Sequence, residues 1–330
     1  MKKKILVSGA GGFIGGHLVS KLMKDGFNIV CADIKPFNKW FQIFEENLNH
    51  SIDLKDYEAC LRVTKNVDYV FNLSCNMGGM GFIENNKAEC MLSVLINTNL
   101  LRTSHINQVK KFLFSSSACV YNIDKQKNTN TQGLREDESY PAYPEDGYGW
   151  EKLFSERMCR HFKEDFNLDV RIVRLHNVYG HLGTYSGGRE KAPAAICRKI
   201  AEAKINNSDT IDVWGDGEQT RSFMFIDDCI EGLLKIFNSD YSEPINLGST
   251  EQVSINNLVN KIETIANYKI NKNYLIDKPK GVRGRSSDNS LIKKTINWEP
   301  NITLSEGLKI TYEWIFEQIS SKKTDKKFSN

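Results

Sequence analysis

The order of apolar and polar residues along the chain predicts alternating strands and helices. Short apolar runs typical of buried strands occupy residues 4–8, 28–33, 68–73, 112–114 and 169–175. Longer segments between them carry apolar residues at every third or fourth position, as on an amphipathic helix. Strands that alternate with helices of this length form βαβ units, so we predict an α/β fold on a doubly wound, parallel Rossmann sheet.

Three of the segments between strands have helical periodicity. The first spans residues 13–24 and ends before Gly26, and the others span about 88–108 and 149–164. In a doubly wound fold the second and third helices lie side by side. We expect their apolar faces to form the interface of a homodimer.

A glycine-rich turn joins the first predicted strand to the first predicted helix. Gly9, Gly12 and Gly15 line this turn, and Phe13 and Ile14 begin the helix. Glycines at this spacing allow a tight turn, let backbone amides approach a pyrophosphate and let the helix pack closely on the sheet. The phosphates then lie at a helix N-terminus, which favours negative charge. The turn therefore predicts a dinucleotide site that includes these five residues.

An acidic residue at the end of the second predicted strand bears on the choice of dinucleotide. Asp33 can accept both ribose hydroxyls of an adenosine but repels a 2′-phosphate, so we expect NAD rather than NADP. The alternative is a surface aspartate that starts a turn. Asp53 and Leu54 end a similar strand and are expected to cover the adenine, and Ser74, after the next strand, is expected to bind the cofactor as well.

Groups capable of redox and proton chemistry follow the strand at residues 112–114. Ser117 and Cys119 fall at its carboxyl end, where open α/β sheets bind ligands. Downstream, Tyr148 and Lys152 form a Tyr-x-x-x-Lys pair, and Lys191 follows two glycines, an arginine and Glu190. The alternatives without a catalytic role are a buried, unreactive Cys119 and a surface-exposed Lys191 at the start of a helix. Together, the hydroxyl, thiol, phenol and ammonium groups suit redox chemistry coupled to proton transfer.

The regular alternation breaks after residue 175, where long glycine-rich stretches begin. Irregular segments of this length in a compact domain are usually functional. We therefore expect a dinucleotide-binding domain of residues 1–180 plus about 224–248 and a substrate domain of residues 181–223 and 249–320. Residues 321–330 are expected to form a basic, solvated tail.

Arginines stand among glycines in two of these stretches. Arg221 lies in the stretch 214–223, and Arg283 and Arg285 lie in the stretch 281–285. The planar fork of arginine binds phosphate through paired hydrogen bonds, so these loops are expected to clamp a second diphosphate. The alternative is a set of surface turns with incidental arginines.

Composition narrows the class of protein. The 330 residues include 44 Lys and Arg against 41 Asp and Glu, a net charge of +3 that is too small to argue for nucleic acid. No apolar run approaches the ~20 residues of a membrane span and no signal peptide precedes the first strand, so a cytoplasmic location is expected. Eight cysteines without a Cys-x-x-Cys pair and six histidines without ligand spacing predict neither disulfides nor a metal site. Six of the cysteines are expected to be small buried residues.

With these motifs the chain resembles the extended short-chain dehydrogenase/reductases, and within that family the GDP-mannose 3,5-epimerase group. The resemblance runs from Gly9 to about Gln318. It rests on the glycine turn, on the Tyr-x-x-x-Lys pair, and on the stretches 77–81, 117–119, 177–180, 187–195, 214–217 and 281–285. The chain departs from the pattern of this group at Cys75, Asn76 and His181, which bears on the identity of the sugar.

The resemblance implies a reaction and a set of roles. The sugar of a GDP-hexose is oxidised at C4 with NAD, inverted at C5, C3 or both, and reduced again. Tyr148, Lys152 and Ser117 are expected to serve the redox step, with Cys119 as a thiolate base and Lys191 as a protonated donor. The substrate contacts that the resemblance implies are Met77, Gly78, Ser117, Asn177, Glu190, Lys191, Ala192, Trp214, Gln219, Arg221, Arg283 and Arg285.

Three alternatives stay open. A C4 epimerase, a dehydratase or a reductase of the same fold shares Gly9, Tyr148 and Lys152 but does not need both Cys119 and Lys191. The dehydratases usually carry an acid just after the serine of this stretch. A GDP-heptose-specific relative fits the same motifs, and a non-catalytic nucleotide-sugar sensor is the remaining class.

Overall fold

A computed structural model describes residues 2–321 and 326–328. Its main feature is a sheet of seven parallel strands in the order β11-β6-β5-β4-β1-β2-β3. The strands are β1 (Lys4–Ser8), β2 (Asn28–Asp33), β3 (Leu48–Ser51), β4 (Tyr69–Asn72), β5 (Lys111–Ser117), β6 (Asp169–Leu175) and β11 (Ile245–Leu247). The predicted doubly wound α/β sheet is confirmed. Strand order reverses between β1 and β4, and ligands bind at such a switch point.

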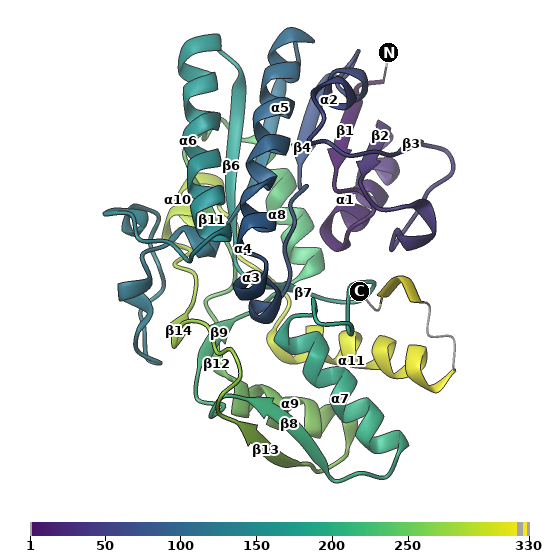
Figure 1. Cartoon of the computed structure of the whole chain (residues 1–330), viewed down its shortest axis with the longest axis vertical. Coiled ribbons are helices and arrows are strands. Elements are labelled where there is room, and N and C mark those ends of the chain that lie inside the picture. The colour runs from purple at the N-terminus through teal and green to yellow at the C-terminus, as the bar shows by residue number, and fades with distance from the viewer. Residues whose placement is uncertain (1, 322–325, 329–330) are drawn as a thin grey trace.

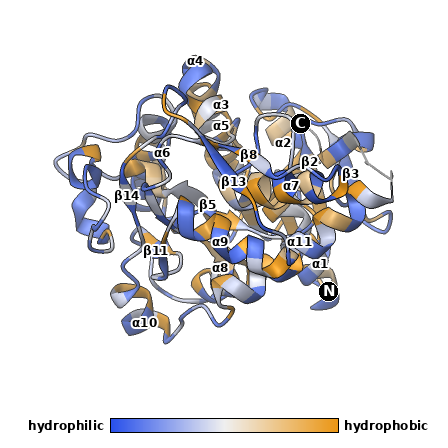
Figure 2. Cartoon of the chain, turned by 90° about the horizontal axis from the view of Figure 1, so that it is seen from below, coloured by the Kyte–Doolittle hydropathy of each residue, from blue (hydrophilic) through white to orange (hydrophobic). Residues whose placement is uncertain are grey.

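Helices cover both faces of this sheet (Figure 1). On one face α1 (Phe13–Lys24) packs against α8 (Ile226–Asn238). On the other, α5 (Ser93–Ile106) packs between α2 (Tyr57–Val63) and α6 (Tyr148–Phe166). Hydrophobic and hydrophilic residues alternate along α8 and α9 (Ile255–Ala266) in Figure 2, because each helix buries only one side.

The segment before α6 differs from the prediction in two ways. The glycine-rich loop after β4 ends at Gly79, and a short helix, α3 (Met80–Asn85), begins where a longer loop was expected. The single helix predicted for 88–108 is divided at Leu92 into α4 (Lys87–Met91) and α5. Periodicity alone missed the division because the apolar residues stay in phase across it.

A smaller region follows β6 and is built around α7 (Ala192–Ile205), α9 and α11 (Leu304–Ser320). Its sheets have the orders β12-β9-β14 and β13-β8. Their strands are β8 (Thr210–Trp214), β9 (Thr220–Ser222), β12 (Gln252–Ser254), β13 (Asn271–Leu275) and β14 (Gly284–Arg285). The remaining elements are β7 (Val178–Tyr179) paired with β10 (Met224–Phe225), α10 (Ser290–Ile296), and the 3-10 helices η1 (Phe37–Lys39), η2 (Ala118–Val120), η3 (Ile123–Gln126), η4 (Glu136–Ser139) and η5 (Lys326–Phe328).

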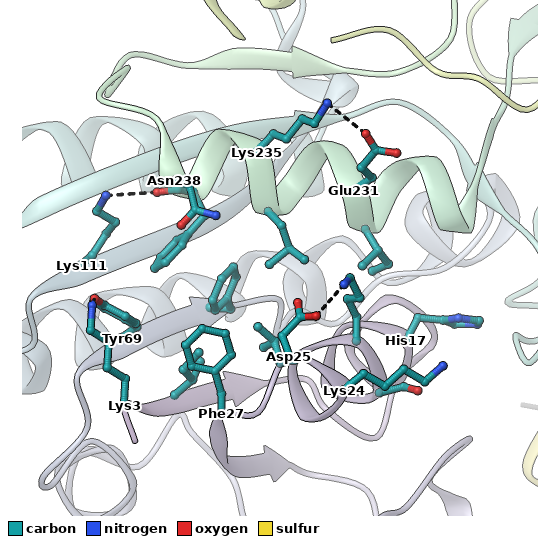
Figure 3. A pocket seen from close by; sticks show the side chains of 18 of the residues that line it. Lys3, His17, Lys24, Asp25, Phe27, Tyr69, Lys111, Glu231, Lys235 and Asn238 are labelled. Carbon is teal, nitrogen blue, oxygen red and sulfur yellow. Dashed lines mark hydrogen bonds and ion pairs between the residues drawn. The ribbon is translucent and has the colours of Figure 1, made fainter. Parts of the chain in front are cut away.

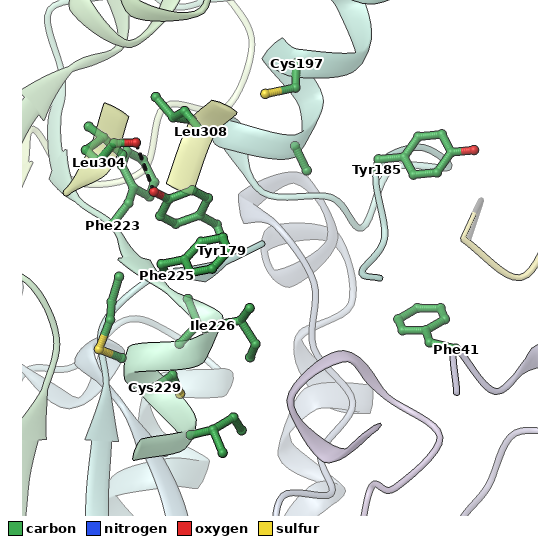
Figure 4. Close-up of a cluster of buried hydrophobic side chains, with 14 of the residues drawn as sticks. Phe41, Tyr179, Tyr185, Cys197, Phe223, Phe225, Ile226, Cys229, Leu304 and Leu308 are labelled. Carbon is green, nitrogen blue, oxygen red and sulfur yellow. Dashed lines mark hydrogen bonds between the residues drawn. The ribbon is translucent and has the colours of Figure 1, made fainter. Parts of the chain in front are cut away.

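One hydrophobic core runs through both regions. Tyr179 of β7 and Phe225 of β10 lie beside Leu304 and Leu308 of α11 (Figure 4). The Tyr179 hydroxyl donates a hydrogen bond to the Leu304 carbonyl at 3.1 Å. The two regions are therefore packed together, and the division into two domains stays a prediction.

Buried cysteines follow the expectation from sequence. Cys31 in β2 and five cysteines on helices are buried and free: Cys60, Cys90, Cys159, Cys197 and Cys229. Among the described residues no helix is long and apolar enough to cross a membrane.

The predicted solvated tail contains a buried aromatic residue. Phe328 is 3 % exposed, and its ring lies 5.3 Å from that of Phe41 and 5.1 Å from that of Trp314. Its carbonyl accepts a hydrogen bond from the Tyr185 amide at 3.2 Å. The expectation of a fully solvated end is wrong at Phe328, because this residue joins α11 to the segment after β2.

We predict that Phe328→Ala lowers the free energy of unfolding by on the order of 3 kcal/mol, because truncation of a buried phenylalanine leaves a cavity. The midpoint of urea unfolding should fall. Phe37→Ala is the control, since Phe37 is 45 % exposed. Equal midpoints for the two variants would contradict a structural role for Phe328.

Candidate active site

The glycine turn has the close approaches that a phosphate-binding turn requires. Gly9 has φ +76°, and a Cβ on Gly15 would lie 2.1 Å from the Gly9 carbonyl oxygen. Gly12 precedes the first turn of α1, which begins with Phe13 and Ile14. The chain after β4 also comes close, since a Cβ on Gly9 would lie 3.2 Å from the Ser74 amide. The predicted residues are thus brought together, and free amides at the start of α1 point to an anion.

At the end of β2 the Asp33 carboxylate is buried and accepts the Lys35 amide at 3.0 Å. Burial raises its pKa, which the nearby backbone amides and the Lys35 ammonium oppose. Lys35 itself reaches the Gly11 carbonyl at 3.5 Å. Sequence reasoning missed this lysine, although it stands two residues beyond the strand end. The Asp33 carboxylate therefore has a cation beside it, and its contact with a ribose stays a prediction.

Asp53 and Leu54, which were predicted to cover the adenine, differ in where their side chains lie. Asp53 lies beyond the end of β3 and pairs with Lys55 at 3.6 Å. The Leu54 side chain, by contrast, belongs to the core beneath the sheet, with Val30 and Cys60. The Leu54 side chain is thus not available to the base, and a contact of Leu54 with the adenine, which would have to come from its main chain, stays a prediction.

Ser117, Tyr148 and Cys119 meet where β5 ends and α6 begins. The Ser117 hydroxyl accepts the Cys119 amide at 3.2 Å and hydrogen-bonds the Tyr148 phenol. Burial, with Cys75, Cys119 and Glu151 nearby, raises the pKa of Tyr148 well above its usual value. The hydroxyl and the phenol therefore lie together, as predicted for a redox step.

Lys152 lies one turn further along α6 and is fully buried. Its ammonium nitrogen is 3.6 Å from a Glu151 carboxylate oxygen and 5.6 Å from the centre of the Tyr148 ring. Burial opposes its charge, but Cys75 and Glu151 hold its pKa above the ordinary value. Glu151 therefore competes with a Tyr148 phenolate for the positive charge of Lys152. Sequence reasoning did not consider Glu151.

Cys119 is surrounded by charged groups. The Arg285 guanidinium donates to its sulfur at 3.5 Å and to Glu145 at 3.2 Å. Burial first, and then Glu145, raise the pKa of the Cys119 thiol to about 12, while Arg285 lowers it. Burial therefore opposes the expected thiolate more than the cation favours it, and the role of Cys119 as a base stays a prediction.

Lys191 occupies the N-cap position of α7, whose first residue is Ala192, and its side chain makes no capping hydrogen bond. Burial lowers the pKa of Lys191, while its interactions with Cys119 and Cys75 raise it. The preceding Glu190 accepts the Gly188 amide at 2.7 Å and faces Arg198. The structure thus brings Lys191 into the same charged cluster as Cys119.

The loop before α7 contacts the segment after β4. Arg189 donates to the Asn76 side chain at 3.1 Å and to the Met77 carbonyl at 3.2 Å, and lies 3.8 Å over the centre of the Phe82 ring. Gly78 also packs against Phe82. Sequence reasoning missed Arg189, whose partners lie more than 100 residues away.

The three predicted phosphate arginines lie near one another, since Arg221 and Arg285 are paired across β9 and β14 and Arg283 also acts on Arg221, but each contacts other groups of the protein. Arg221 donates to the carbonyls of Lys280 and Val282, and Arg283 pairs with Asp216 at 2.9 Å. Arg285 instead faces Cys119, so its predicted place in a phosphate clamp is not supported by its contacts. For Arg221 and Arg283, binding of a diphosphate stays a prediction.

The other predicted substrate contacts line the neighbouring strands. The Asn177 amide donates to the Ser222 carbonyl at 3.1 Å, and the Gln219 amide donates to the Trp214 carbonyl at 2.9 Å. The Gln219 amide oxygen is buried and has no hydrogen-bond partner among the described residues. Trp214 lies against Gly81.

A cavity of about 710 Å³ lies away from all these residues, between α1 and α8 (Figure 3). Lys3, Tyr69 and Lys111 line it at the amino ends of the strands. Because doubly wound sheets bind ligands at the carboxyl ends, we do not assign the chemistry to this cavity.

Comparison with known proteins agrees with the geometry. Residues 5–248 match the model of the NAD dependent epimerase/dehydratase family. The chain belongs to this family. A GDP-mannose 3,5-epimerase of Arabidopsis thaliana is 45 % identical over 321 residues, which cover 97 % of this chain and 84 % of that protein. A GDP-mannose 3,5-epimerase of Oryza sativa subsp. indica is also 45 % identical, over 98 % of this chain and 84 % of that protein.

Solved epimerases share the fold. A UDP-glucose 4-epimerase of Thermotoga maritima, solved with UDP-glucose, has a TM-score of 0.87 and 25 % identity, with 96 % of this chain and 99 % of that one covered. A UDP-glucuronic acid 4-epimerase of Bacillus cereus, solved with UDP-glucuronic acid and NAD, has a TM-score of 0.80 and 25 % identity, with 96 % and 99 % covered. NAD is the cofactor of the family, and the Gly9 to Gly15 cradle and Asp33 fit it.

We predict that Asp33→Asn shifts cofactor preference toward NADP by at least tenfold, measured by titrating each dinucleotide. The carboxylate that repels a 2′-phosphate is removed, while Lys35 stays in place to attract it. Asp33→Asn with Lys35→Ala should lose most of this gain. Unchanged preference in Asp33→Asn would remove the assignment of Asp33 to the ribose.

Proposed function

We propose that this family member inverts C5, C3 or both of a GDP-hexose through transient oxidation at C4. The observation that carries the proposal is that Cys119 packs with Tyr148 and that Lys191 interacts electrostatically with Cys119. A redox step needs the tyrosine, but a C4 epimerase or a reductase has no use for an added thiol and ammonium. Both groups suit proton transfer at carbon.

The chemistry explains why oxidation comes first. A carbon that carries only hydroxyl neighbours is a very weak acid, whereas a carbon next to a ketone loses its proton far more easily. Oxidation at C4 places C3 and C5 next to the same ketone. NAD, when bound, accepts the hydrogen of C4 and later returns it.

The redox step at C4 is assigned to three residues, Tyr148, Ser117 and Lys152. Tyr148 takes the proton of the C4 hydroxyl and gives it back when the ketone is reduced, and Ser117 hydrogen-bonds the same oxygen. Burial raises the pKa of Tyr148, so the phenolate that accepts this proton needs a positive charge nearby to stabilise it. Lys152, buried on the same helix, supplies that positive charge.

Proton transfer at C3 or C5 is assigned to Cys119 and Lys191. One removes it from a face of the ring and the other delivers a proton to the opposite face. Burial raises the pKa of Cys119 and lowers that of Lys191. The thiol is therefore not restricted to the role of base, and the amine is not restricted to the role of acid. The thiol can act as the acid in one direction and as the base in the other.

A guanosine diphosphate sugar is favoured by the 45 % identical relatives named as GDP-mannose 3,5-epimerases. Arg221 and Arg283 at the mouth of the site suit its diphosphate. Which hexose or heptose is used is a matter for direct titration with GDP-mannose and UDP-glucose. A cytoplasmic location stays a prediction from sequence.

We predict that in D₂O the wild-type protein places deuterium at C3, C5 or both of GDP-mannose, while C4 keeps its hydrogen. Cys119→Ala and Lys191→Ala should each slow this exchange by about 10²–10⁴-fold, the usual loss of a positioned acid or base. Mass spectrometry and NMR of the recovered sugar nucleotide measure the exchange.

The redox step serves as the internal control, since Tyr148 and Lys152 are intact in both variants. Each variant should still show the absorbance of reduced cofactor on mixing with substrate. Exchange at the wild-type rate in Cys119→Ala, in Lys191→Ala and in the double variant would rule out the proposed inversion pair.

The exposed faces of α5 and α6 support a homodimer. Apolar side chains that are 41–51 % exposed gather on α4, α5 and α6: Met91, Leu92, Leu95, Trp150 and Phe154. The helices lie side by side in Figure 1 and pack on each other. Contiguous exposed apolar surface of this kind usually marks an interface, and a second copy presents a self-complementary face.

We predict that Leu95→Glu converts the protein to a monomer in sedimentation velocity, because a charge would be buried at the interface. Ile310→Glu on α11 is the matched control, as Ile310 and Leu95 are both 43 % exposed. A Leu95→Glu variant with the sedimentation coefficient of the wild type would place any dimer interface elsewhere.

A further inference from the structure

A buried ion pair lies directly against the Cys119 thiol. The Glu145 carboxylate is 3.2 Å from Arg285, and one guanidinium nitrogen of Arg285, Nη1, donates both to this carboxylate and to the sulfur of Cys119. The backbones are joined as well, since the Glu145 amide donates to the Cys119 carbonyl at 3.0 Å. Glu145 is 8 % exposed and Arg285 4 %. The carboxylate is therefore held against the thiol from two directions.

This cluster contains two acidic groups and one immediate cation. Although burial opposes ionisation of Glu145, Arg285 is the largest of the influences that hold its pKa below the ordinary value. The same Arg285 donates to the sulfur at 3.5 Å. One guanidinium can neutralise one anion, so an ionised Glu145 keeps the thiol protonated, and a protonated Glu145 leaves the cation to a thiolate.

Other charged groups face the cluster from every side. They are Arg221 of β9, Lys191 at the start of α7, Tyr148 of α6 and Glu84 of α3. Arg285 is also held by the side chain of Gln126, which is neutral. None of these groups bridges the thiol and the Arg285 guanidinium as Glu145 does.

We propose that Glu145 is the proton partner of Cys119, a positioning residue that takes the thiol proton when the thiolate is needed and returns it afterwards. The proposal rests on the function proposed above and deepens it. It also explains how a buried thiol can become a base.

The transfer balances without any outside reactant. The S–H bond of Cys119 breaks, an O–H bond forms on Glu145, and the electron pair stays on sulfur beside Arg285. The thiolate then takes a proton from the sugar carbon, whose electron pair passes into the C4 ketone. The net charge of Glu145, Cys119 and Arg285 is unchanged by the first transfer, so no charge is left uncompensated in the buried site.

Glu145→Gln tests the pair, because the amide keeps the size and the hydrogen bonds of the carboxylate but cannot take the proton. Arg285 then has only the sulfur to neutralise. We expect the midpoint of the pH dependence of Cys119 alkylation to fall by at least about one unit, the usual effect of a neighbouring charge. Iodoacetamide is the probe, used on the NAD-loaded protein, with the Cys119 peptide quantified by mass spectrometry.

Glu145→Asp is the matched control, since it keeps a carboxylate one methylene shorter. Its midpoint should stay within half a unit of the wild-type value by the same reasoning. In the Gln variant, deuterium exchange at C3 and C5 should fall about 10²-fold or more, while oxidation at C4 continues. A merely structural role for Glu145 would reduce both steps together.

An unchanged midpoint in Glu145→Gln overturns the proposal. If that variant fails to fold, the wild type alone decides, because a wild-type midpoint at or below ~8.5, the value of a free thiol, excludes a carboxylate that keeps the proton on sulfur. Alkylation requires no sugar chemistry. A shifted midpoint in a protein whose wild type exchanges no deuterium would therefore support the Glu145 and Cys119 pair and refute the epimerase function.

Discussion

A guanidinium group buried as deeply as that of Arg285 must be paired, and its pairing shapes the candidate active site. An uncompensated buried charge costs several kcal/mol. Arg285 finds its partners in Gln126, Glu145 and the sulfur of Cys119, all more than 100 residues away in sequence. The strand β14 of the smaller region is thereby held against the end of β5. The two regions cannot separate here without leaving both charges unpaired.

The same constraint leaves the mouth of the site positively charged. Burial, and then Arg285 as a like charge, lower the pKa of Arg221 to about 10. Arg283 is neutralised by Asp216, and Glu145 is engaged with Arg285. Arg221 donates only to neutral carbonyl groups among the described residues. An anionic ligand relieves this repulsion, which is the physical reason to place a diphosphate near Arg221 rather than on Arg285.

Features that depend on neighbouring residues were predictable from sequence, and features that depend on distant ones were not. The span of α1, the strand at 169–175 and the turn from Gly9 to Gly15 follow from local periodicity and backbone freedom. The pairing of Glu145 with Arg285 depends on a contact across 140 residues, and no spacing motif encodes it. The raised pKa of the Cys119 thiol was not predictable for the same reason, because burial and Glu145 cause it. The burial of Phe328 likewise depends on Phe41 and Trp314, which only the folded chain brings together.

Burial acts in opposite directions on the two groups proposed to move the carbon proton. It disfavours the anion of Cys119 and so raises the pKa of the thiol, and it disfavours the cation of Lys191 and so lowers the pKa of the amine. In water a thiol is the stronger acid of the two, so a proton passing between them would run strongly one way. The buried site opposes this bias, because it shifts the two pKa values in opposite directions. Each group is thereby made less committed to one role, and inversion in either direction requires the residues on both faces of the sugar ring to give and to take a proton.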